Sequence, residues 1–429
     1  MSTTQRPRRV AIVAAQRTPF ARSGTAYASL SNQTMLTDTL RSLVEKCHLE
    51  GERLGQVVGG AVMKHASDWN LVRECVLGSG LDPATPACDL QMACGTSLEA
   101  AALIANKIAL GQIECGIACG SDTTSDAPVE VSRGMQRTLM DIHAARTTTD
   151  RLKAGIRLAN PRNLLPKLPT NAEPRTGKSM GQHAEITAQR LGTTREAQDK
   201  LALTSHQKLA KAYDRGFFDD LVMPYKGLTQ DNNLRRDTTL EKLGSLRPVF
   251  DRKAGTITAG NASPLTDGAS AVLLASDAWA RAHDLPVLAY LVDTEVAAVD
   301  FIDEREGLLL APAYAVSRML TRRGLALQDF DFYEIHEAFA AVVLSTLAVW
   351  ESKDFCVNRL GLAEALGSID KRKLNAAGSS VAAGHPFAAT GGRLLGTLAK
   401  LLSEKPGGGR GLISICAAGG QGITAILER

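Results

Sequence analysis

The sequence of 429 residues has few aromatic side chains, a nearly balanced charge and no long apolar run. A net charge of only +4 is too small to indicate a nucleic-acid-binding protein. No stretch reaches the ~18 consecutive apolar residues of a membrane-spanning helix, so we expect none. Aromatic residues make up 4%, whereas there are 38 glycines. This composition favours helices packed closely on strands, or tight loops around a ligand.

The sequence also lacks the usual signs of disulfide or metal chemistry. It has eight cysteines, but the basic stretch 1–9 leads into no apolar segment long enough for a signal peptide. We therefore expect free thiols in a reducing cytoplasm. Cys115 and Cys119 are close in sequence, but no second pair of cysteines accompanies them, so we expect no metal site.

Apolar runs and helical patterns alternate along most of the chain, which predicts an α/β protein. Between 133 and 256 the composition changes: charged residues and prolines become more frequent, and patterns typical of strands are scarce. We interpret this segment as a mostly helical insertion. The predicted divisions are 1–132 for an N-terminal half, 133–256 for the insertion, 257–283 for the return of that half, and 284–429 for a C-terminal half.

The order strand, loop, helix, strand and glycine loop occurs twice. The first copy contains Cys94, a helical pattern over 98–110 and a strand over 113–119. The second contains His385, a helical pattern over 391–402 and a strand over 411–416. The repeat favours an internal duplication, although any two α/β units resemble each other to some degree.

Cys94 and His385 are the first candidates for catalysis. Cys94 lies where a helix is expected to begin, and a helix N-terminus lowers the pKa of a thiol. His385 lies between Gly384 and Pro386, just before another helix, where it could act as a general base. The alternatives are a buried structural cysteine and a loop histidine with a structural hydrogen bond.

Cys416 and His336 are weaker candidates, which would add a second acid/base and an oxyanion donor to the nucleophile and the base. Cys416 ends an apolar run and precedes a glycine loop, so it could exchange a proton while the loop's N–H groups hold an oxyanion. His336 and Glu337 follow an expected strand, where a neutral imidazole could donate to a developing oxyanion. A core cysteine and a helix-capping pair are the alternatives. All these residues are expected at strand ends, where sites of α/β proteins gather.

Five ordered motifs resemble those of the thiolase family over nearly the whole chain. They are the loop around Cys94, 260–263 (Gly-Asn-Ala-Ser), 336–339 (His-Glu-Ala-Phe), 384–386 (Gly-His-Pro) and 416–422. His336 stands where the family usually has Asn, and the loop after Cys416 begins with two alanines. These departures resemble the branch containing the β-subunit of the trifunctional fatty-acid oxidation enzyme and its bacterial counterparts.

The resemblance implies a fold of two similar βαβαβαββ halves, packed as an α-β-α-β-α layered sandwich, with a mostly helical loop domain inserted in the first half. It implies an acyltransferase that cleaves 3-ketoacyl-CoA with CoA, through an acyl-cysteine on Cys94. His385 would be the base, Cys416 the second acid/base and His336 the enolate donor. Ala418 would supply an oxyanion N–H, and Ser263 would lie near the pantetheine. No metal or cofactor is implied, since CoA is a substrate.

Other functions remain open at this stage. The same site could condense two acetyl-CoA molecules, and a set of Cys94, His336 and His385 resembles a decarboxylating ketoacyl synthase. Cys416 argues against the synthase, because decarboxylation needs no second thiol. A non-catalytic acyl-CoA or lipid carrier would not need Cys94 or His385.

The positive charge is concentrated in one stretch. Residues 133–178, the basic segment, contain ten Lys and Arg against three Asp and Glu, a local charge of +7. It could attract CoA phosphates, make peripheral contact with a membrane or dock a partner; a solvated face is the plain alternative. By family analogy we expect a homodimer or homotetramer, or a complex with a hydratase/dehydrogenase subunit.

Overall fold

The computed structural model describes residues 7–167, 169–170 and 172–429. The first half contributes five strands in the order β4-β3-β5-β6-β1. Strands β3, β4 and β5 are parallel, whereas β6 runs antiparallel to both β5 and β1. These strands are β1 (Val10–Arg17), β3 (Gln56–Gly59), β4 (Ala87–Asp89), β5 (Cys115–Asp122) and β6 (Thr266–Ser276). A short strand, β2 (Ala21–Arg22), also pairs with β6.

The second half repeats this arrangement with its own strands. Its order is β7-β10-β9-β8, with β8 parallel to β9 and β10 antiparallel to both neighbours. A parallel bridge from Tyr333 to Leu374 occupies the place that β4 has in the first half. The strands are β7 (Ala289–Ala298), β8 (Phe332–Ile335), β9 (Arg410–Ala417) and β10 (Gln421–Glu428). The matching order and direction confirm the predicted duplication.

One feature of the sheets was not anticipated from the sequence. The resemblance implies two similar halves without a link between their sheets, but β1 and β7 pair through Ala11–Tyr290 and Ile12–Ala289 and so join the halves. The result is one sheet of ten strands among the described residues. All eight residues of β1 are buried, because helices cover both of its faces.

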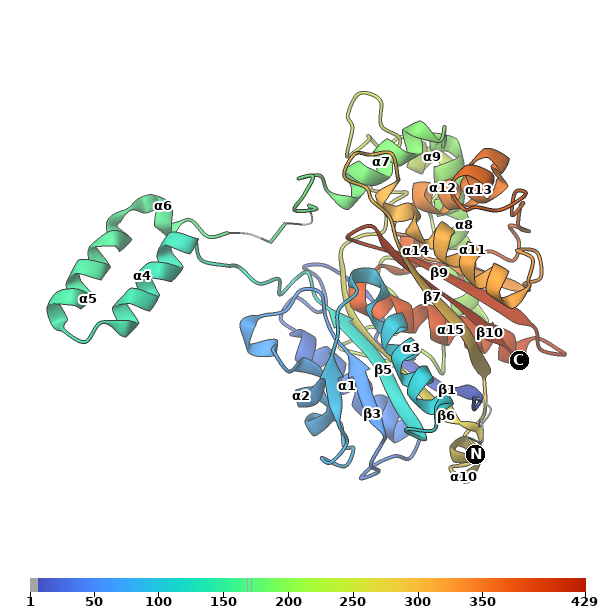
Figure 1. Ribbon diagram of the computed structural model, residues 1–429, viewed down its shortest axis with the longest axis horizontal. Coiled ribbons are helices and arrows are strands. Elements are labelled where there is room, and N and C mark those ends of the chain that lie inside the picture. The colour runs from blue at the N-terminus through green and yellow to red at the C-terminus, as the bar shows by residue number, and fades with distance from the viewer. Residues whose placement is uncertain (1–6, 168, 171) are drawn as a thin grey trace.

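Helices form three layers around the two halves of the sheet (Figure 1). The central layer is α3 (Thr96–Ala109) and α15 (Thr390–Glu404), which contact each other and strands of the sheet. One outer layer is α1 (Asn32–Lys46) and α2 (Leu71–Gly78); the other is α11 (Ala311–Arg323) and α12 (Ala340–Glu351). Side chains of β1 alternate between the core clusters, with Ile12 in the central one and Ala11 and Val13 in the outer one. The layering is the predicted α-β-α-β-α sandwich.

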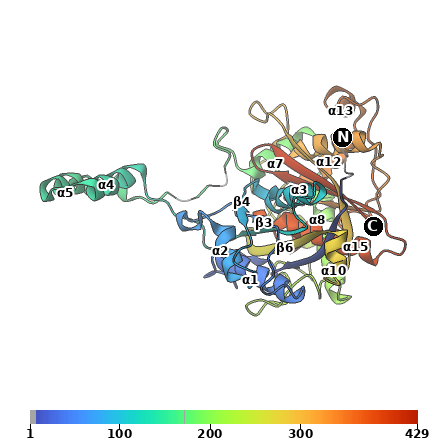
Figure 2. The same ribbon diagram turned by 60° about the horizontal axis from the view of Figure 1, so that its bottom comes forward.

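The inserted segment has two parts with different surroundings. Helices α7 (Met180–Arg190), α8 (Arg195–Asp214) and α9 (Leu240–Gly244) pack on the body, with α7 and α8 against α12. Helices α4 (Arg133–Ala144), α5 (Thr148–Gly155) and α6 (Pro161–Leu164) instead form an arm, residues 130–167, that projects from the body in both ribbon views (Figures 1 and 2). The prediction of a mostly helical insertion is confirmed for the described residues.

Local signals explain where several of these helices begin and end. Ser179 caps α7 in a capping box with Gln182, and Thr194 caps α8 by accepting from Ala197 N–H. Gly324 ends α11 in the left-handed conformation, at a φ of 63°. The remaining helices are short: α10 (Asp277–Ala282), α13 (Lys353–Asn358) and α14 (Ser380–Ala383).

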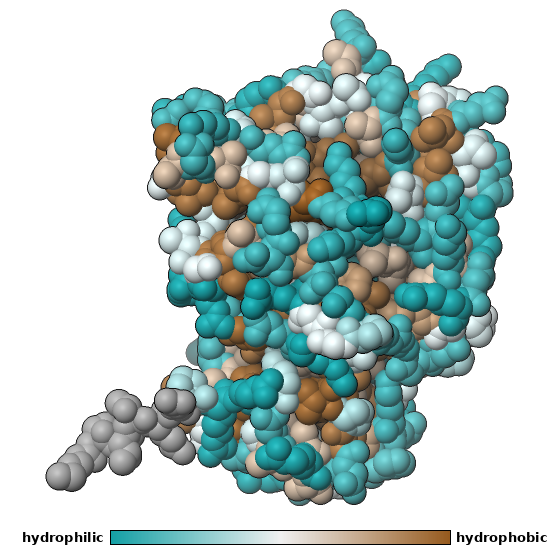
Figure 3. Space-filling model, turned by 90° about the vertical axis from the view of Figure 1, so that its right-hand side faces the viewer, coloured by the Kyte–Doolittle hydropathy of each residue, from teal (hydrophilic) through white to brown (hydrophobic). Residues whose placement is uncertain are grey.

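The molecular surface is consistent with a compact body. The face opposite the arm mixes hydrophilic side chains with several separate apolar patches (Figure 3). Across the part of the chain that the structure describes, no helix combines the length and the apolar character needed to cross a membrane.

Candidate active site

Cys94 lies at the start of the central helix α3, as the sequence predicts. The strand β4 ends at Asp89, and a turn of 3-10 helix (Ala93–Gly95) leads into α3. Ala93 adopts a φ of 45°, unusual for a residue with a side chain. The hydroxyl of Thr96 donates to the Ala93 carbonyl and accepts from the N–H of Met92. These bonds hold the turn that presents the Cys94 sulfur.

His385 reaches Cys94 from the other half of the molecule. Its Nε2 lies 3.0 Å from Cys94 Sγ, and its Nδ1 lies 2.5 Å from Thr390 Oγ1. The backbone N–H of His385 donates to Thr266 Oγ1. Gly384, at a φ of 107°, allows this approach, because a Cβ there would lie 2.7 Å from Thr266 Cγ2. Three hydrogen bonds therefore orient the imidazole toward the thiol.

Burial decides where the proton of this pair resides. It raises the pKa of Cys94 to about 12, although the N–H groups of Ala418 and Cys94 itself lower it in part. Burial, helped by the charge of Arg393, lowers the pKa of His385 to about 3. The N–H of Cys94 at the start of the helix thus lowers the thiol pKa in the expected direction, but burial is the larger effect. At neutral pH the pair is a thiol beside a neutral imidazole.

Cys416 lies at the end of β9, beside the loop that approaches Cys94. Its side chain is buried, and burial together with the neighbouring Cys94 raises the pKa of its thiol. Ala418, two residues later, points its N–H at the Cys94 sulfur. The next N–H, that of Gly419, donates to Glu173 Oε1 at 2.6 Å. The loop thus places a second thiol and a backbone donor around Cys94, and Glu173 holds it in place.

His336 completes the group from the end of β8. It is buried, and its ring centroid lies 4.2 Å from that of His385. Burial, followed by the neighbouring His385 and Arg393, holds the pKa of His336 well below its ordinary value. Its partner in the motif, Glu337, points elsewhere and accepts from Ser205, Asn375 and the N–H of Val381. Glu337 therefore supports the structure, whereas His336 faces the reacting groups.

A cavity of about 190 Å³ opens over the two cysteines and His385, whereas the buried His336 is not among the residues that line it. Cys94, His385, Cys416, Ser263 and Ala418 all line it. The rest of its wall is largely apolar, as is usual for a small-molecule site. The main apolar side chains are Met180, Phe250, Leu309, Phe339 and Phe387.

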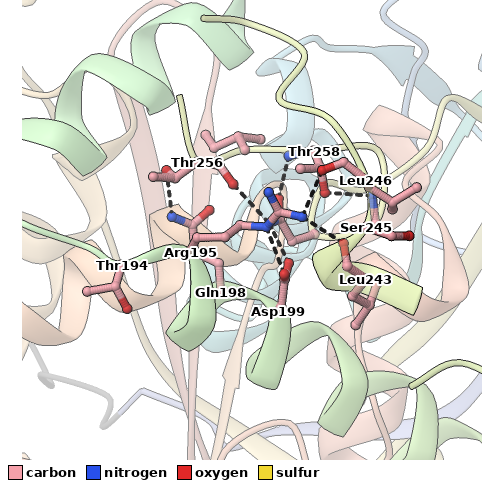
Figure 4. A network of polar contacts seen from close by, with 12 residues as sticks. Thr194, Arg195, Gln198, Asp199, Leu243, Ser245, Leu246, Thr256 and Thr258 are labelled. Atoms are coloured by element: carbon pink, nitrogen blue, oxygen red, sulfur yellow. Dashed lines mark hydrogen bonds and ion pairs between the residues drawn. The ribbon is translucent and has the colours of Figure 1, made fainter. Parts of the chain in front are cut away.

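A polar network around Arg195 and Asp199 of α8 (Figure 4) extends to the segment that carries Ser263. Arg195 of α8 pairs with Asp199 at 2.7 Å, and Asn261 donates to the same carboxylate at 2.9 Å. The Asn261 side chain also accepts from Thr258 N–H at 2.8 Å, which closes the turn before Ser263. The Ser263 hydroxyl donates to the Ala338 carbonyl at 2.9 Å. These hydrogen bonds therefore connect the inserted helix α8, the turn before Ser263 and the wall of the cavity.

Cys94, His336 and His385 are also the one group among the described residues with the spacing of a metal-binding set. One nitrogen or sulfur atom from each lies within 4.8 Å of the others. Such donors suit zinc. The hydrogen bond from the thiol to His385 gives the same atoms a role in proton transfer, and that role needs no ion.

Sequence analysis missed the residues that orient these groups. Thr390 and Thr266 bind His385, and Asp122 accepts from the N–H of Ala388, at 2.8 Å, just beyond that histidine. Ser380 lies 2.8 Å from Nδ1 of His336. The signals were weak, because these are common polar residues without a distinctive spacing. Burial raises the pKa of Asp122 to about 6, but this sign of a special environment appears only in the folded structure.

Comparison with known families matches both halves of the chain. The model of the thiolase N-terminal domain covers residues 10–278, and that of the C-terminal domain covers residues 285–429. The chain therefore belongs to the thiolase family.

The most informative relatives are 3-ketoacyl-CoA thiolases. Those of Pectobacterium atrosepticum and Yersinia pestis are 42% and 41% identical, and each alignment covers 99% of this chain and 98% of the relative. Human mitochondrial 3-ketoacyl-CoA thiolase, solved with CoA, has a TM-score of 0.81 at 28% identity, with 98% of each chain covered. A Bacillus anthracis acetyl-CoA acetyltransferase has a TM-score of 0.80 at 28% identity, covering 99% of this chain and 100% of that one.

Proposed function

We propose that this thiolase cleaves 3-ketoacyl-CoA with CoA, giving acetyl-CoA and an acyl-CoA shortened at the broken bond. The observation that carries the proposal is the 3.0 Å contact between Cys94 Sγ and His385 Nε2, with the thiol of Cys416 on the same cavity wall. Full-length similarity to 3-ketoacyl-CoA thiolases supports the same substrate and a role in fatty-acid β-oxidation. Condensation of two acetyl-CoA molecules is the less favoured direction.

In the first half-reaction, Cys94 attacks the 3-keto carbon while His385 accepts its proton. A neutral imidazole is ready for this role, because the pKa of His385 is low and the thiol holds the proton at rest. The N–H groups of Cys94 and Ala418 hold the oxyanion of the tetrahedral adduct. The Cα–Cβ bond then breaks, and acetyl-CoA leaves as an enolate.

Cys416 and His336 act on the departing enolate. The thiol of Cys416 protonates its carbon, which gives acetyl-CoA, and His336 donates a hydrogen bond to its oxygen. In the second half-reaction, CoA enters and Cys416 takes the proton of its thiol. The CoA sulfur attacks the acyl group on Cys94, and His385 returns the proton to the released cysteine. The scheme needs no metal or redox cofactor, because every step is a proton or acyl transfer.

Variants of the two cysteines test the scheme. Cys94→Ala should abolish acyl-enzyme formation, whereas Cys416→Ala should still become acylated, but slowly. Mass spectrometry after brief exposure to a 3-ketoacyl-CoA reads the acyl adduct, and a thiolysis assay across acyl lengths reads turnover. Full turnover by Cys94→Ala would contradict the scheme. Carbon dioxide release from a malonyl thioester would favour a ketoacyl synthase, and absence of any fast-reacting cysteine would favour a carrier.

Substrate binding follows from the shape and charge of the surroundings. Ser263 lines the cavity, and we propose that it lies beside the pantetheine arm of CoA. Basic residues of the segment 133–178 supply positive potential for the CoA phosphates. The apolar wall receives the acyl chain.

A reducing, cytoplasmic compartment and a homo-oligomer complete the proposal. All eight cysteines are free, and Cys94 and Cys416 must both remain thiols for turnover. Family resemblance supports a dimer or tetramer, alone or with a hydratase/dehydrogenase subunit.

For the arm, we propose peripheral contact with an anionic lipid surface. Its exposed apolar side chains include Met140, Leu152 and Ile156, each more than 60% exposed. Lys and Arg of the basic segment lie among them, an arrangement typical of interfacial helices.

A further inference from the structure

The two ring nitrogens of His336 have different surroundings. Nδ1 lies 2.8 Å from the hydroxyl oxygen of Ser380. Nε2, on the other side of the ring, is buried and has no hydrogen-bond partner among the described residues. A nitrogen of His336 lies within 4.8 Å of both Cys94 Sγ and a nitrogen of His385. Nδ1 is occupied by Ser380, so Nε2 is the ring nitrogen that no described residue engages.

Ser380 in turn is held by Arg393, which lies on α15. Nη2 of Arg393 donates to Ser380 Oγ at 2.7 Å and more weakly to Ser379 Oγ at 3.3 Å. Arginine can only donate, so the Ser380 oxygen is the acceptor in this bond. Ser380 is fully buried, which leaves its single hydroxyl proton in need of an acceptor.

The acceptor within reach is Nδ1 of His336. If Nδ1 carried a proton, Arg393 and His336 would both donate to Ser380. The buried hydroxyl hydrogen of Ser380 would then have no acceptor among the described residues, which is unfavourable. The arrangement that satisfies every group has Ser380 donating to Nδ1.

A neutral imidazole carries one N–H, so the state of Nδ1 determines that of Nε2. Burial and the nearby charge of Arg393 keep His336 neutral, since they hold its pKa well below the ordinary value. With Nδ1 accepting, the proton lies on Nε2. The ring therefore presents a donor, not a lone pair, toward the reacting groups.

We propose that Ser380, oriented by Arg393, is a positioning residue that fixes His336 as the Nε2-protonated tautomer. This inference rests on the proposed thiolase reaction and explains how a histidine serves there as an enolate donor. In the other tautomer, a nitrogen lone pair would face the enolate oxygen and repel it. An asparagine at 336 would need no such control, because its amide nitrogen always carries hydrogens.

Arg393 keeps its charge in this role although it is buried. Nearby carboxyl groups, those of Glu334, Asp231 and Glu337, only partly offset the desolvation of its guanidinium. The pKa of Arg393 is lowered by burial to about 10, so the side chain is still charged at neutral pH. Ser380 and Arg393 flank His385 in the sequence, so one segment orients both histidines.

Kinetics of Ser380 variants test the inference. Ser380→Ala should lower kcat for thiolysis by about tenfold or more with little change in KM, because an oxyanion donor is weakened only in the transition state. Deuterium exchange from solvent into the methyl group of acetyl-CoA should fall in parallel. Ser380→Thr, which retains a hydroxyl, is the matched control and should recover most of the activity.

A double-mutant cycle separates this role from a structural one. In a His336→Asn background, Ser380→Ala should change kcat by less than about twofold, since the amide has no tautomer to fix. An equal loss in both backgrounds would overturn the inference, as would a Ser380→Ala variant with unchanged kcat.

Nitrogen NMR of histidine-labelled protein gives a readout that does not depend on activity. We expect the wild type to carry its His336 proton on Nε2 and Ser380→Ala to show a mixture of tautomers. A proton on Nδ1 in the wild type would overturn the inference even if thiolysis is confirmed. Conversely, an inactive wild type with the proton on Nε2 would contradict the proposed function alone.

Discussion

At the scale of single residues, the proton shared by Cys94 and His385 lies on the Cys94 sulfur before substrate reacts. Cys94 lies at the start of a helix. At an exposed site, that position stabilises a thiolate by up to about 1 kcal/mol. Burial opposes it and is the stronger effect, because it raises the pKa of Cys94 to about 12 and lowers that of His385 to about 3. The nucleophile is therefore activated during attack, by transfer of its proton to His385.

This view predicts no preformed thiolate at neutral pH. Wild type and Cys94→Ala should have the same ultraviolet thiolate absorbance near pH 7, and the difference should appear only as the pH approaches about 12. The sign follows from the raised pKa of the thiol, which keeps its proton over the whole neutral range. A titration step in the difference spectrum between pH 4 and 7 would instead indicate a stable thiolate–imidazolium pair.

At the scale of helices and strands, contact between α3 and α15 brings the two halves of the site together. Gly391, in the first turn of α15, lies so close to α3 that a Cβ would be 2.5 Å from the backbone nitrogen of Leu98. The next residue, Gly392, donates its N–H to Ser97 Oγ at 2.8 Å. Because Cys94 and His385 each lie just before one of these helices, the distance between the helices sets the distance between the reacting atoms.

A methyl group at this contact should therefore damage both stability and catalysis. Gly391→Ala forces the helices apart, and we expect a loss of about 1–3 kcal/mol in the free energy of unfolding, measured with urea. Acyl-enzyme formation should slow as well. Gly244→Ala is the matched control, since a Cβ there meets no atom within 4 Å. Equal urea midpoints and equal acylation for Gly391→Ala and wild type would contradict this account.

At the scale of the whole molecule, the arm is separate from the chemistry. The backbones of Glu130 and Lys167 are hydrogen bonded to each other in both directions, so the ends of the arm lie side by side. Its helices α4 and α5 pack against each other, and the residues that line the catalytic cavity come from other segments. The ribbon views show the arm extending away from the layered body.

Removing the arm should therefore leave the catalytic step intact and abolish the contact with lipid. With residues 131–166 replaced by a short Gly-Ser link, we expect an unchanged kcat for thiolysis, a higher KM for CoA because most of the basic segment is gone, and loss of co-sedimentation with anionic vesicles. Leu152→Ser should weaken co-sedimentation, whereas Leu240→Ser, an exposed leucine outside the arm, should not. Sedimentation of the intact chain that is insensitive to salt and to anionic lipid would refute the membrane proposal. A partner subunit would then be the occupant to test.

Much of the fold and the set of site residues could be predicted from the sequence. Alternating strands and helices predicted the α/β class, and the repeated order of strand, loop, helix, strand and glycine loop predicted the duplication. Four of the five motifs singled out Cys94, His336, His385 and Cys416, which the structure brings to one cavity or its immediate surroundings. The domain divisions and the roles of these residues stay predictions.

Only the tertiary structure decided how these groups are set for chemistry. Cys94 and His385 are 291 positions apart, so their 3.0 Å contact depends on the packing of the two halves. Burial and hydrogen bonds between distant segments determine which atom of this pair carries the proton. They also determine the tautomer of His336 and the pairing of β1 with β7. Local patterns in a sequence report which residues share a helix face or a strand end. Desolvation and hydrogen-bond partners are properties of the assembled interior, and they exist only once the chain has folded.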